Sequence, residues 1–547
     1  MQIESFETHP DRYTHWKLSV DGPVARLVMD VQEDDGSGKP YVLKLNSYDV
    51  FVDIELADAV NRLRWEHPEV KVVVVTSAQD RIFCAGANIP MLASSPHAFK
   101  VNFCKYTNET RLSIEDASET ADQKYIAACN GVASGGGYEL ALACDEIVLV
   151  DDRSSAVSLP EVPLLGVLPG TGGLTRVTDK RKVRRDLADY FSSLAEGVRG
   201  KRAVNWNLID ATFKLSKFEK GVQSRVDALL ADIADKPGAS PMTWTPLSVE
   251  VGADGSRRYG HVDLDLDVEN RRANLTVRTP DSVGPTTAEA VREAGMKWWP
   301  LQAFRELEDA LLHLRFNHLD VGCVVLRAEG DGAVALGVDG VLEDLKDDWF
   351  VGEVRHYIRR VLKKVDVTSR TFFALIDEGT AFAGTLLELA LAADRTFMLD
   401  HPDETVWVAS SALNGGAYPM GNGITRLECR FLGEPEKVGQ ILEQAGEKLI
   451  TPDAEDLGLL TFAPDDIDWD DEIRVALEER ASPSPDALTG MEANLRFAGP
   501  ETMETKIFGR LSAWQNWIFQ RPNAVGPNGA LKAFGQPTAA TFNWERT

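Results

Sequence analysis

Hydrophobic and polar positions at the start of the chain follow the patterns of strands and helices. Two β-rich pieces flank the turn at 21–23 within residues 15–31, which predicts a hairpin. Residues 48–65 repeat apolar positions at helical spacing, with Val52, Leu56, Val60 and Leu63 on one face. Residues 72–76 form a continuous β-branched run, which is typical of a fully buried strand. Strands and helices alternating in this order predict an α/β architecture with a parallel sheet.

A glycine-rich stretch follows the next apolar run. Residues 125–129 predict a short buried strand, Gly135, Gly136 and Gly137 come after it, and residues 138–143 predict a helix with Glu139 in its first turn. Each glycine disfavours a helix by roughly 1 kcal/mol, and a chain accepts this cost where its backbone must come close to another group. N–H groups at the start of a helix suit an oxygen that develops negative charge. An ordinary tight turn is the alternative.

The second half repeats the order of the first. Asp58, Glu139 and Thr175 have counterparts at Asp309, Glu388 and Thr425, separated by 251, 249 and 250 residues. Such steady offsets predict two tandem copies of one fold, residues 1–255 and residues 256–547. We expect the join near residues 252–258, where Gly, Asp and Ser cluster. Residues after about 464 are predicted to be helical and rich in loops.

Charge and composition exclude several classes of partner. The net charge of −27 argues against nucleic acid and anionic membranes, which attract basic surfaces. The first ten residues lack the apolar core of a secretory signal, and no apolar run approaches the ~20 residues of a membrane helix. The six cysteines show no Cys-x-x-Cys spacing and the histidines no His-x-x-x-His spacing. We therefore expect a cytoplasmic protein with reduced thiols and no metal site.

Three motifs, separated along the chain, stand in a characteristic order. They are Phe-Cys-Ala-Gly-Ala-Asn-Ile at 83–89, Asn-Gly-x-x-x-Gly-Gly-Gly-x-Glu-Leu at 130–140, and Pro-Glu at 160–161 followed by Pro-Gly-x-Gly-Gly at 169–173. Together they resemble the crotonase (enoyl-CoA hydratase/isomerase) superfamily, strongly over residues 15–215 and weakly in the second half. The resemblance implies a spiral of ββα repeats and a coenzyme A thioester substrate.

The same resemblance implies roles for particular residues. The backbone N–H groups of Ala87 and Gly136 would hold the thioester oxygen, Glu139 and Glu161 would act as acid and base, and Cys104 would lie in the segment that lines the acyl pocket. Two carboxylates in one pocket of low dielectric tend to separate in pKa, which suits paired acid and base roles. The alternatives are a carboxylate that stabilises a helix dipole for Glu139, a solvated loop for Glu161, and a buried free thiol for Cys104.

The chain departs from the superfamily pattern at three places. Asn88 stands where the superfamily often has Asp, and we expect it to support the turn. The spacer from Glu161 to Gly166 is one residue longer than usual. In the second copy, Thr385 and Ser411 stand at the positions of Gly136 and Glu161, so we expect that copy to be structural.

The reaction cannot be chosen from the fold alone, because crotonases run several reactions. Two crotonase-like copies, the second degenerate, resemble a ring-cleaving branch of the superfamily. That resemblance implies hydrolytic opening of the ring of 2,3-epoxy-2,3-dihydrobenzoyl-CoA to formate and 3,4-didehydroadipyl-CoA semialdehyde, with no cofactor beyond coenzyme A. It also implies a homo-oligomer, with a dimer as the simplest form. A 2-enoyl-CoA hydratase or isomerase and a non-catalytic acyl-CoA-binding scaffold are the alternatives.

Overall fold

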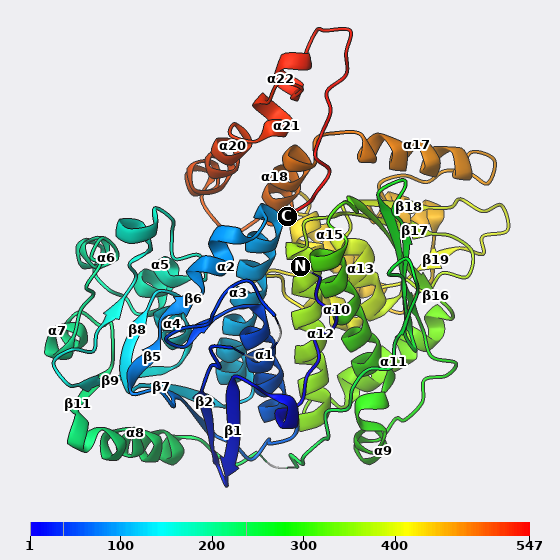
Figure 1. The fold of residues 1–547 in the computed structure, drawn as a ribbon. Helices are drawn as coiled ribbons and strands as arrows, with labels where there is room; N and C mark the ends of the chain where they lie inside the picture. The colour runs from blue at the N-terminus through cyan, green and yellow to red at the C-terminus, as the bar shows by residue number, and fades with distance from the viewer. Residues whose placement is uncertain (1, 35, 37, 237) are drawn as a thin grey trace. The chain divides into compact units, whose positions relative to one another are not determined.

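The chain folds into two compact units (Figure 1). A computed structural model describes residues 2–34, 36, 38–236 and 238–547. Residues 4–244 form the first unit, and residues 245–547 with residues 2–3 form the second. Across the described residues, every helix is too short or too polar to span a bilayer.

The main sheet of the first unit begins with the predicted hairpin. Strands β1 (Trp16–Asp21) and β2 (Val24–Met29) pair antiparallel around the turn at Gly22. The sheet order is β1-β2-β4-β7-β9-β11, and each later strand runs parallel to its neighbour. The later strands are β4 (Val72–Ser77), β7 (Lys124–Cys129), β9 (Glu146–Asp151) and β11 (Ala211–Lys214). Both buried strands expected from the sequence are therefore present.

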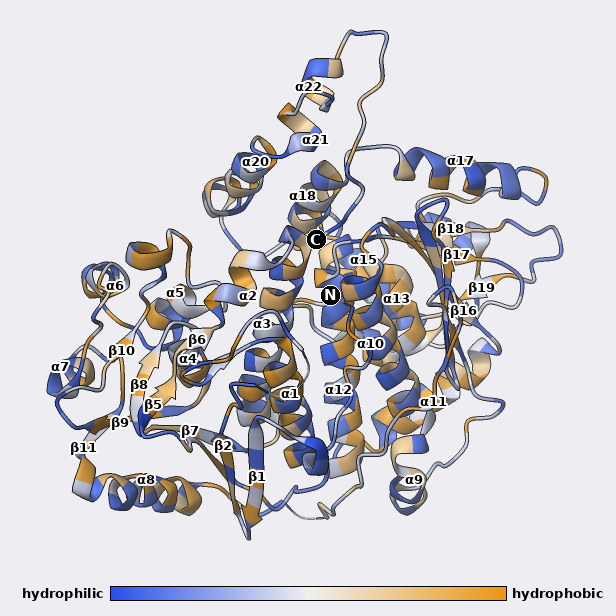
Figure 2. Ribbon diagram, viewed as in Figure 1, coloured by the Kyte–Doolittle hydropathy of each residue, from blue (hydrophilic) through white to orange (hydrophobic). Residues whose placement is uncertain are grey.

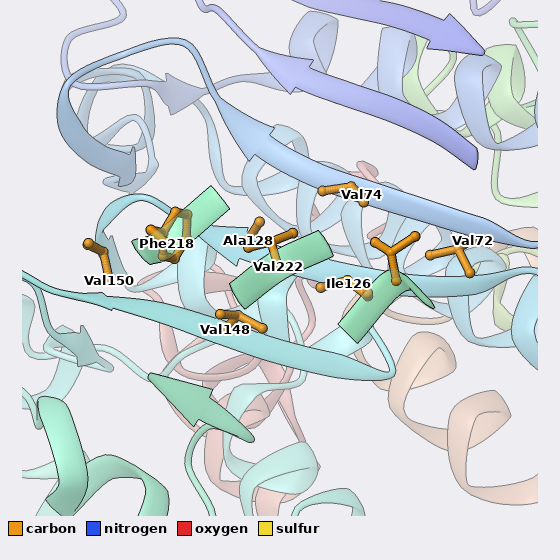
Figure 3. Packing of buried hydrophobic residues seen from close by; sticks show 9 residues of the cluster. Val72, Val74, Ile126, Ala128, Val148, Val150, Phe218 and Val222 are labelled. Carbon is orange, nitrogen blue, oxygen red and sulfur yellow. The ribbon is translucent and has the colours of Figure 1, made fainter. Parts of the chain in front are cut away.

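One face of this sheet is covered by α8 (Phe218–Asp232). Alternate residues of a strand face the same side, so every second residue of β4, β7 and β9 points at this helix. The resulting core contains Val72, Val74, Ile126, Ala128, Val148, Val150, Phe218, Val222 and Val226, each at most 4% exposed. Figure 3 shows these side chains gathered between the strands and the helix. Hydrophobic and hydrophilic residues alternate along α8 in Figure 2, as its half-buried position requires.

Helix α1 (Val50–Trp65) begins two residues later than expected. Asp49 caps it, accepting hydrogen bonds from the N–H groups of Phe51 and Val52 at 2.9 and 3.2 Å. Tyr48 belongs instead to strand β3 (Ser47–Tyr48), which pairs parallel with β6 (Gly86–Ala87). The apolar pattern over residues 48–65 predicted one helix, whereas Asp49 divides this stretch into the end of strand β3 and helix α1.

A small parallel sheet carries the glycine-rich turn. Its order is β10-β8-β5, with β10 (Val157–Ser158), β8 (Gly131–Ser134) and β5 (Arg81–Cys84). Strand β8 was not expected, and helix α4 (Gly136–Ala143) starts at Gly136 instead of Tyr138. Strand β8 can lie close to β5 because Gly131 has no side chain: a methyl group there would lie 1.9 Å from the carbonyl carbon of Arg81.

The remaining elements of the first unit are helical. They are η1 (Pro10–Arg12), α2 (Ile89–Ser94), α3 (His97–Thr120), η2 (Glu161–Leu165), α5 (Gly173–Thr175), η3 (Arg176–Lys180), α6 (Arg185–Ser192), α7 (Gly200–Asn205) and η4 (Leu215–Lys217).

The sheet of the second unit has the order β12-β13-β14-β15-β16-β17-β18. Its strands are β12 (Glu250–Val251), β13 (Arg257–Arg258), β14 (Val262–Asp267), β15 (Arg272–Arg278), β16 (Cys323–Glu329), β17 (Thr371–Ile376) and β18 (Arg395–Met398). The first four pair antiparallel and the rest parallel. Residues 252–258, where we expected the join, form the turn and return strand of a hairpin inside this sheet, and the two units divide between Trp244 and Thr245.

The helices of the second unit include the predicted helical region after residue 464. Upstream are α9 (Ala288–Ala294), η5 (Gly295–Lys297), α10 (Trp299–Asn317), α11 (Gly332–Asp344), α12 (Trp349–Val367), η6 (Gly384–Leu386), α13 (Leu387–Ala392), η7 (Ala412–Gly415), α14 (Arg426–Arg430), α15 (Glu436–Glu443) and α16 (Thr451–Asp456), with the strand pair β19 (Trp407–Val408) and β20 (Leu449–Ile450). Downstream are α17 (Trp469–Ala481), α18 (Pro485–Leu495), α19 (Met503–Thr505), η8 (Lys506–Leu511), α20 (Ser512–Ile518), α21 (Pro522–Val525) and α22 (Ala530–Ala533).

Candidate active site

The glycine-rich turn opens α4 in the first unit. Gly135 has φ +54°, a backbone conformation that favours glycine, and its N–H donates to the Ser158 carbonyl at 2.9 Å. Gly136 is the first helical residue, so its N–H lies outside the intrahelical hydrogen-bond ladder. The turn therefore presents backbone N–H groups at the positive end of a helix, as the glycines predicted.

The second predicted donor, the N–H of Ala87, lies next to this turn. The N–H of Asn88 donates to the Tyr48 carbonyl at 2.9 Å. Successive N–H groups of a strand point to opposite sides, so the N–H of Ala87 points away from β3. A methyl group on Gly86 would lie 2.7 Å from the Gly136 nitrogen, which puts β6 directly against the start of α4. Strand β6 and helix α4 thus bring the two predicted donor residues together.

Asn88 supports the turn after β6, as expected. Its side-chain oxygen accepts from the N–H of Met91 at 2.9 Å and caps α2. Its amide nitrogen donates to the Val42 carbonyl at 2.8 Å and to the Ser47 hydroxyl at 3.1 Å. An ionised aspartate has no donor for these two contacts, so the asparagine suits its surroundings here.

Glu139 is buried, and both of its carboxylate oxygens accept hydrogen bonds. Oε1 accepts from the N–H groups of Thr171 and Gly173 at 2.9 and 2.8 Å, and Oε2 accepts from the Thr171 hydroxyl. A methyl group on Gly173 would lie 2.9 Å from Oε1, so glycine is needed for the loop to approach so closely. The loop after Pro169 thus fixes the orientation of the Glu139 carboxylate.

Arg176 holds that loop in turn. Its guanidinium donates to the Thr171 carbonyl at 2.9 Å and makes a paired contact with the Glu115 carboxylate at 2.9 and 2.8 Å. Such two-pronged pairs fix geometry as well as charge. Thr171, Arg176 and Glu115 were not predicted as site residues. The motif at 169–173 marked the loop, but only the fold reveals which side chain its N–H groups face.

Glu161 is also buried, and it lacks the contacts that Glu139 makes. It begins η2, is 9% exposed, and a methyl group on Gly135 would lie 2.7 Å from its Oε1. Among the described residues, its Oε2 has no hydrogen-bond partner. Burial, and then the charge of Glu139, raise the pKa of Glu161 to about 7. Because Glu161 is buried, it is not the solvated loop residue of the alternative interpretation. Both predicted glutamates therefore lie at the glycine turn.

The extra residue after Glu161 is absorbed by a wide helical turn. The N–H of Gly166 donates to the carbonyl of Glu161, five residues earlier, and Gly166 takes φ +64°. Such a turn accommodates one more residue than an α-helical turn, and such wide turns often occur at functional sites. The longer spacer therefore leaves Glu161 beside Gly135.

Cys104, the third predicted side chain, lies on α3 and is half-buried. A methyl group on Gly170 would lie 3.7 Å from its Sγ, so Cys104 faces the loop that holds Glu139. Burial, and then the charge of Glu139, raise the pKa of this thiol to about 11. The thiol is therefore protonated at neutral pH. The described residues include no group of three or more His, Cys, Asp or Glu arranged to hold a metal.

The chain is similar to several known proteins. The family model described as enoyl-CoA hydratase/isomerase matches residues 43–239. Benzoyl-CoA-dihydrodiol lyase of Aromatoleum evansii is 56% identical over 546 residues, which cover 100% of this chain and 98% of that protein. The alpha subunit of the fatty acid oxidation complex of Acinetobacter baylyi is 34% identical over 175 residues, 31% of this chain and 23% of that protein.

Among solved structures, that of an enoyl-CoA hydratase from Geobacillus kaustophilus HTA426 superposes on this chain with a TM-score of 0.35 and a sequence identity of 29%. The match covers 40% of this chain and 75% of that one. The sequence relatives carry the assignment, since one of them matches this chain over its whole length. The chain belongs to the enoyl-CoA hydratase/isomerase family, the crotonases, as a full-length relative of benzoyl-CoA-dihydrodiol lyase.

Proposed function

We propose that the chain is a lyase that opens the ring of 2,3-epoxy-2,3-dihydrobenzoyl-CoA with water. The products are 3,4-didehydroadipyl-CoA semialdehyde and formate, and the balanced reaction consumes two water molecules. The full-length relative, at 56% identity, bears the name of a lyase that acts on a benzoyl-CoA derivative, and this supports the choice of substrate.

In this proposal the N–H groups of Ala87 and Gly136 hold the thioester oxygen. Breaking a carbon–carbon bond at the α-carbon leaves an electron pair there, and the thioester carbonyl delocalises this pair onto its oxygen. Donors fixed in advance stabilise that oxygen without reorganising during the reaction. The contact between Gly86 and Gly136, which brings the two donor residues together, supports this assignment.

Glu139 and Glu161 divide the acid and base work. Glu139 Oε1 already accepts two N–H groups, whereas Oε2 accepts one hydroxyl and keeps a lone pair for a water molecule. We assign Glu139 to orient the attacking water. Glu161, with its pKa raised to about 7, holds a proton that it can donate to the epoxide oxygen. The observation that carries the proposal is the buried Glu161 carboxyl, without a described partner for Oε2, facing the glycine turn beside Glu139. Cys104 lines the acyl pocket.

The second unit, which begins at Thr245, is proposed to be a degenerate copy of the first. Both main sheets contain an antiparallel hairpin followed by parallel strands. At the start of η6, the Asp339 carboxylate accepts from the N–H of Thr385 at 2.7 Å and from the Ser411 hydroxyl at 2.6 Å. Thr385 and Ser411 are the proposed counterparts of Gly136 and Glu161. The N–H group of Thr385 already donates to Asp339, so it is not free to bind a thioester oxygen.

The reaction needs no cofactor beyond the coenzyme A of its substrate, since carboxylates and backbone donors supply the acid–base and electrostatic steps. We further propose that the chain works in the cytoplasm as a homo-oligomer, most simply a dimer, without nucleic-acid or membrane partners. The net charge of −27 supports the last point.

A panel of acyl-CoA thioesters with formate detection tests the proposal. We expect formate from 2,3-epoxy-2,3-dihydrobenzoyl-CoA and no hydration of crotonyl-CoA at a comparable rate. Fast hydration of crotonyl-CoA without formate release from the epoxide would favour the hydratase instead. Tight binding of the thioesters without turnover of any would favour the scaffold.

A further inference from the structure

Tyr48 joins the two predicted donor turns. Its backbone pairs with Ala87 across β3 and β6, and its carbonyl accepts the N–H of Asn88. Its side chain reaches the other turn, because a methyl group on Gly136 would lie 2.1 Å from the Tyr48 hydroxyl oxygen. The phenol end of Tyr48 therefore occupies the flank of the residue whose N–H is proposed to bind the thioester oxygen.

The hydroxyl of Tyr48 is buried without a partner. Tyr48 is 1% exposed, and among the described residues its hydroxyl has no hydrogen-bond partner. Buried polar groups in folded proteins are nearly always paired, so this one calls for an acceptor. Glu161, whose Oε1 would lie 2.7 Å from a methyl group on Gly135, has an Oε2 that is likewise unpartnered among the described residues. Each of the adjacent glycines Gly135 and Gly136 thus has beside it a buried side chain with an unpaired polar atom.

The surroundings of Tyr48 favour the neutral phenol, which can donate a proton in a hydrogen bond. The guanidinium carbon of Arg111 lies 5.1 Å from the centre of the tyrosine ring, and Arg111 is itself paired with Asp53. Burial is the largest cause of a pKa raised well above the ordinary value for Tyr48. Since the phenol stays protonated, a substrate oxygen is a matching acceptor.

We propose that the Tyr48 hydroxyl is a third donor to the thioester oxygen, beside the N–H groups of Ala87 and Gly136. This inference rests on the proposed function only in taking that oxygen to be bound at the glycine turn. It makes Tyr48 a catalytic residue, since its hydroxyl contacts the atom that gains negative charge. It also accounts for glycine at position 136, because the Tyr48 hydroxyl takes the space that a side chain there would need.

The test uses the full chain with benzoyl-CoA, an aryl thioester that has no epoxide to open. Isotope-edited infrared spectroscopy, with ¹³C at the carbonyl, reports how strongly the bound thioester oxygen accepts hydrogen bonds. We expect wild-type chain to lower the carbonyl frequency and Tyr48→Phe to lose part of that shift. We also expect kcat for formate release to fall by roughly 10²-fold in this variant, the scale for removing one donor of this kind, with little change in KM.

Tyr125→Phe is the matched control. Tyr125 lies on β7, is fully buried, and its hydroxyl likewise has no partner among the described residues. The same chemical change there is expected to leave the carbonyl frequency and kcat unaltered. Should Tyr48→Phe fail to fold, 3-fluorotyrosine at position 48, a stronger donor of the same shape, is expected to enlarge the carbonyl shift.

A carbonyl frequency that is the same in wild-type chain, Tyr48→Phe and the fluorinated variant would overturn the inference. So would a bound benzoyl-CoA whose carbonyl frequency in wild-type chain equals that in water. The proposed reaction fails separately: if the carbonyl shift depends on Tyr48 but the epoxide yields no formate, the donor role stands and the ring-opening role does not.

Discussion

Two glutamates near one glycine turn have opposite surroundings, and the roles that we propose for them rest on this difference. Glu139 accepts three hydrogen bonds from Thr171 and Gly173, whereas Glu161 is buried with Oε2 unpartnered among the described residues. A buried carboxyl without partners favours its neutral form. One carboxylate is thus held in place, and the other is ready to exchange a proton.

Stability at alkaline pH tests the state of Glu161. Because its pKa in the folded chain is raised to about 7, the stability that its protonation contributes is present below the unfolded pKa and lost as pH rises through about 7. A shift of this size corresponds to up to about 3 kcal/mol at pH 8. We expect Glu161→Gln to raise the thermal unfolding midpoint at pH 8 more than at pH 5. An equal change at both pH values would contradict the raised pKa.

The pH profile of turnover tests the proposal that Glu161 donates a proton. If the protonated form is required, kcat/KM for the epoxide falls as pH rises through about 7. In Glu161→Gln the remaining activity should lose this fall. A wild-type kcat/KM that instead rises through the same range would assign Glu161 as a base.

Sequence reasoning could name Glu139 and Glu161 because each stands inside a motif of its own. It could not find Thr171 or Tyr48 as site residues. Thr171 follows Glu139 by 32 positions and meets it only through the fold. Tyr48 had the apolar spacing of the following helix, so its place in a strand beside Ala87 was hidden by the pattern.

At the scale of elements, the start of α4 determines the geometry of the site. Strand β6 lies against it, and the flanks of Gly135 and Gly136 are filled by Glu161 and Tyr48. The sequence predicted a glycine turn into a helix, but not that two glycines would be helical or that β8 would precede them. Local preference disfavours glycine in helices, and here the close packing outweighs that preference.

Gly136→Ala tests this packing. The added methyl would lie 2.1 Å from the Tyr48 hydroxyl, so we expect a loss of about 1–3 kcal/mol in stability and a large loss of kcat. Gly340→Ala, on α11, is the control, because among the described residues no atom beyond its chain neighbours and the backbone of its own helix lies within 4 Å of the added methyl. That variant is expected to be as stable as wild type or up to about 1 kcal/mol more stable. Equal behaviour of the two variants would refute the close approach.

At the scale of the molecule, each unit has a sheet in which an antiparallel hairpin is followed by parallel strands. In the second unit β14 and β15 pair antiparallel, as β1 and β2 do in the first. The boundary between the two units was harder to predict from the sequence, because Gly, Asp and Ser cluster both in linkers and in hairpin turns such as 252–256. The contact between Asp339 and Thr385 could not be predicted from the sequence either, because the two residues are 46 positions apart and meet only in the folded chain.

Glu388→Gln tests whether the second unit takes part in the chemistry. Glu388 accepts from Asn414 at 2.7 Å and from Arg426 at 3.1 Å, which is a buried structural pairing. We expect a loss of stability of about 1–3 kcal/mol with kcat nearly unchanged. A large fall in kcat in a folded variant would place Glu388 in the reaction.

We propose that Glu139 and Glu161, beside two backbone donors, open an epoxide ring on a coenzyme A thioester. The most direct measurement is the rate of formate release from 2,3-epoxy-2,3-dihydrobenzoyl-CoA by wild-type chain, Glu139→Gln and Glu161→Gln, with benzoyl-CoA binding as the check on folding. We predict formate from wild type and a kcat lower by roughly 10²–10⁴-fold in each variant, with binding of benzoyl-CoA retained. Formate release at the wild-type rate from either variant would contradict it.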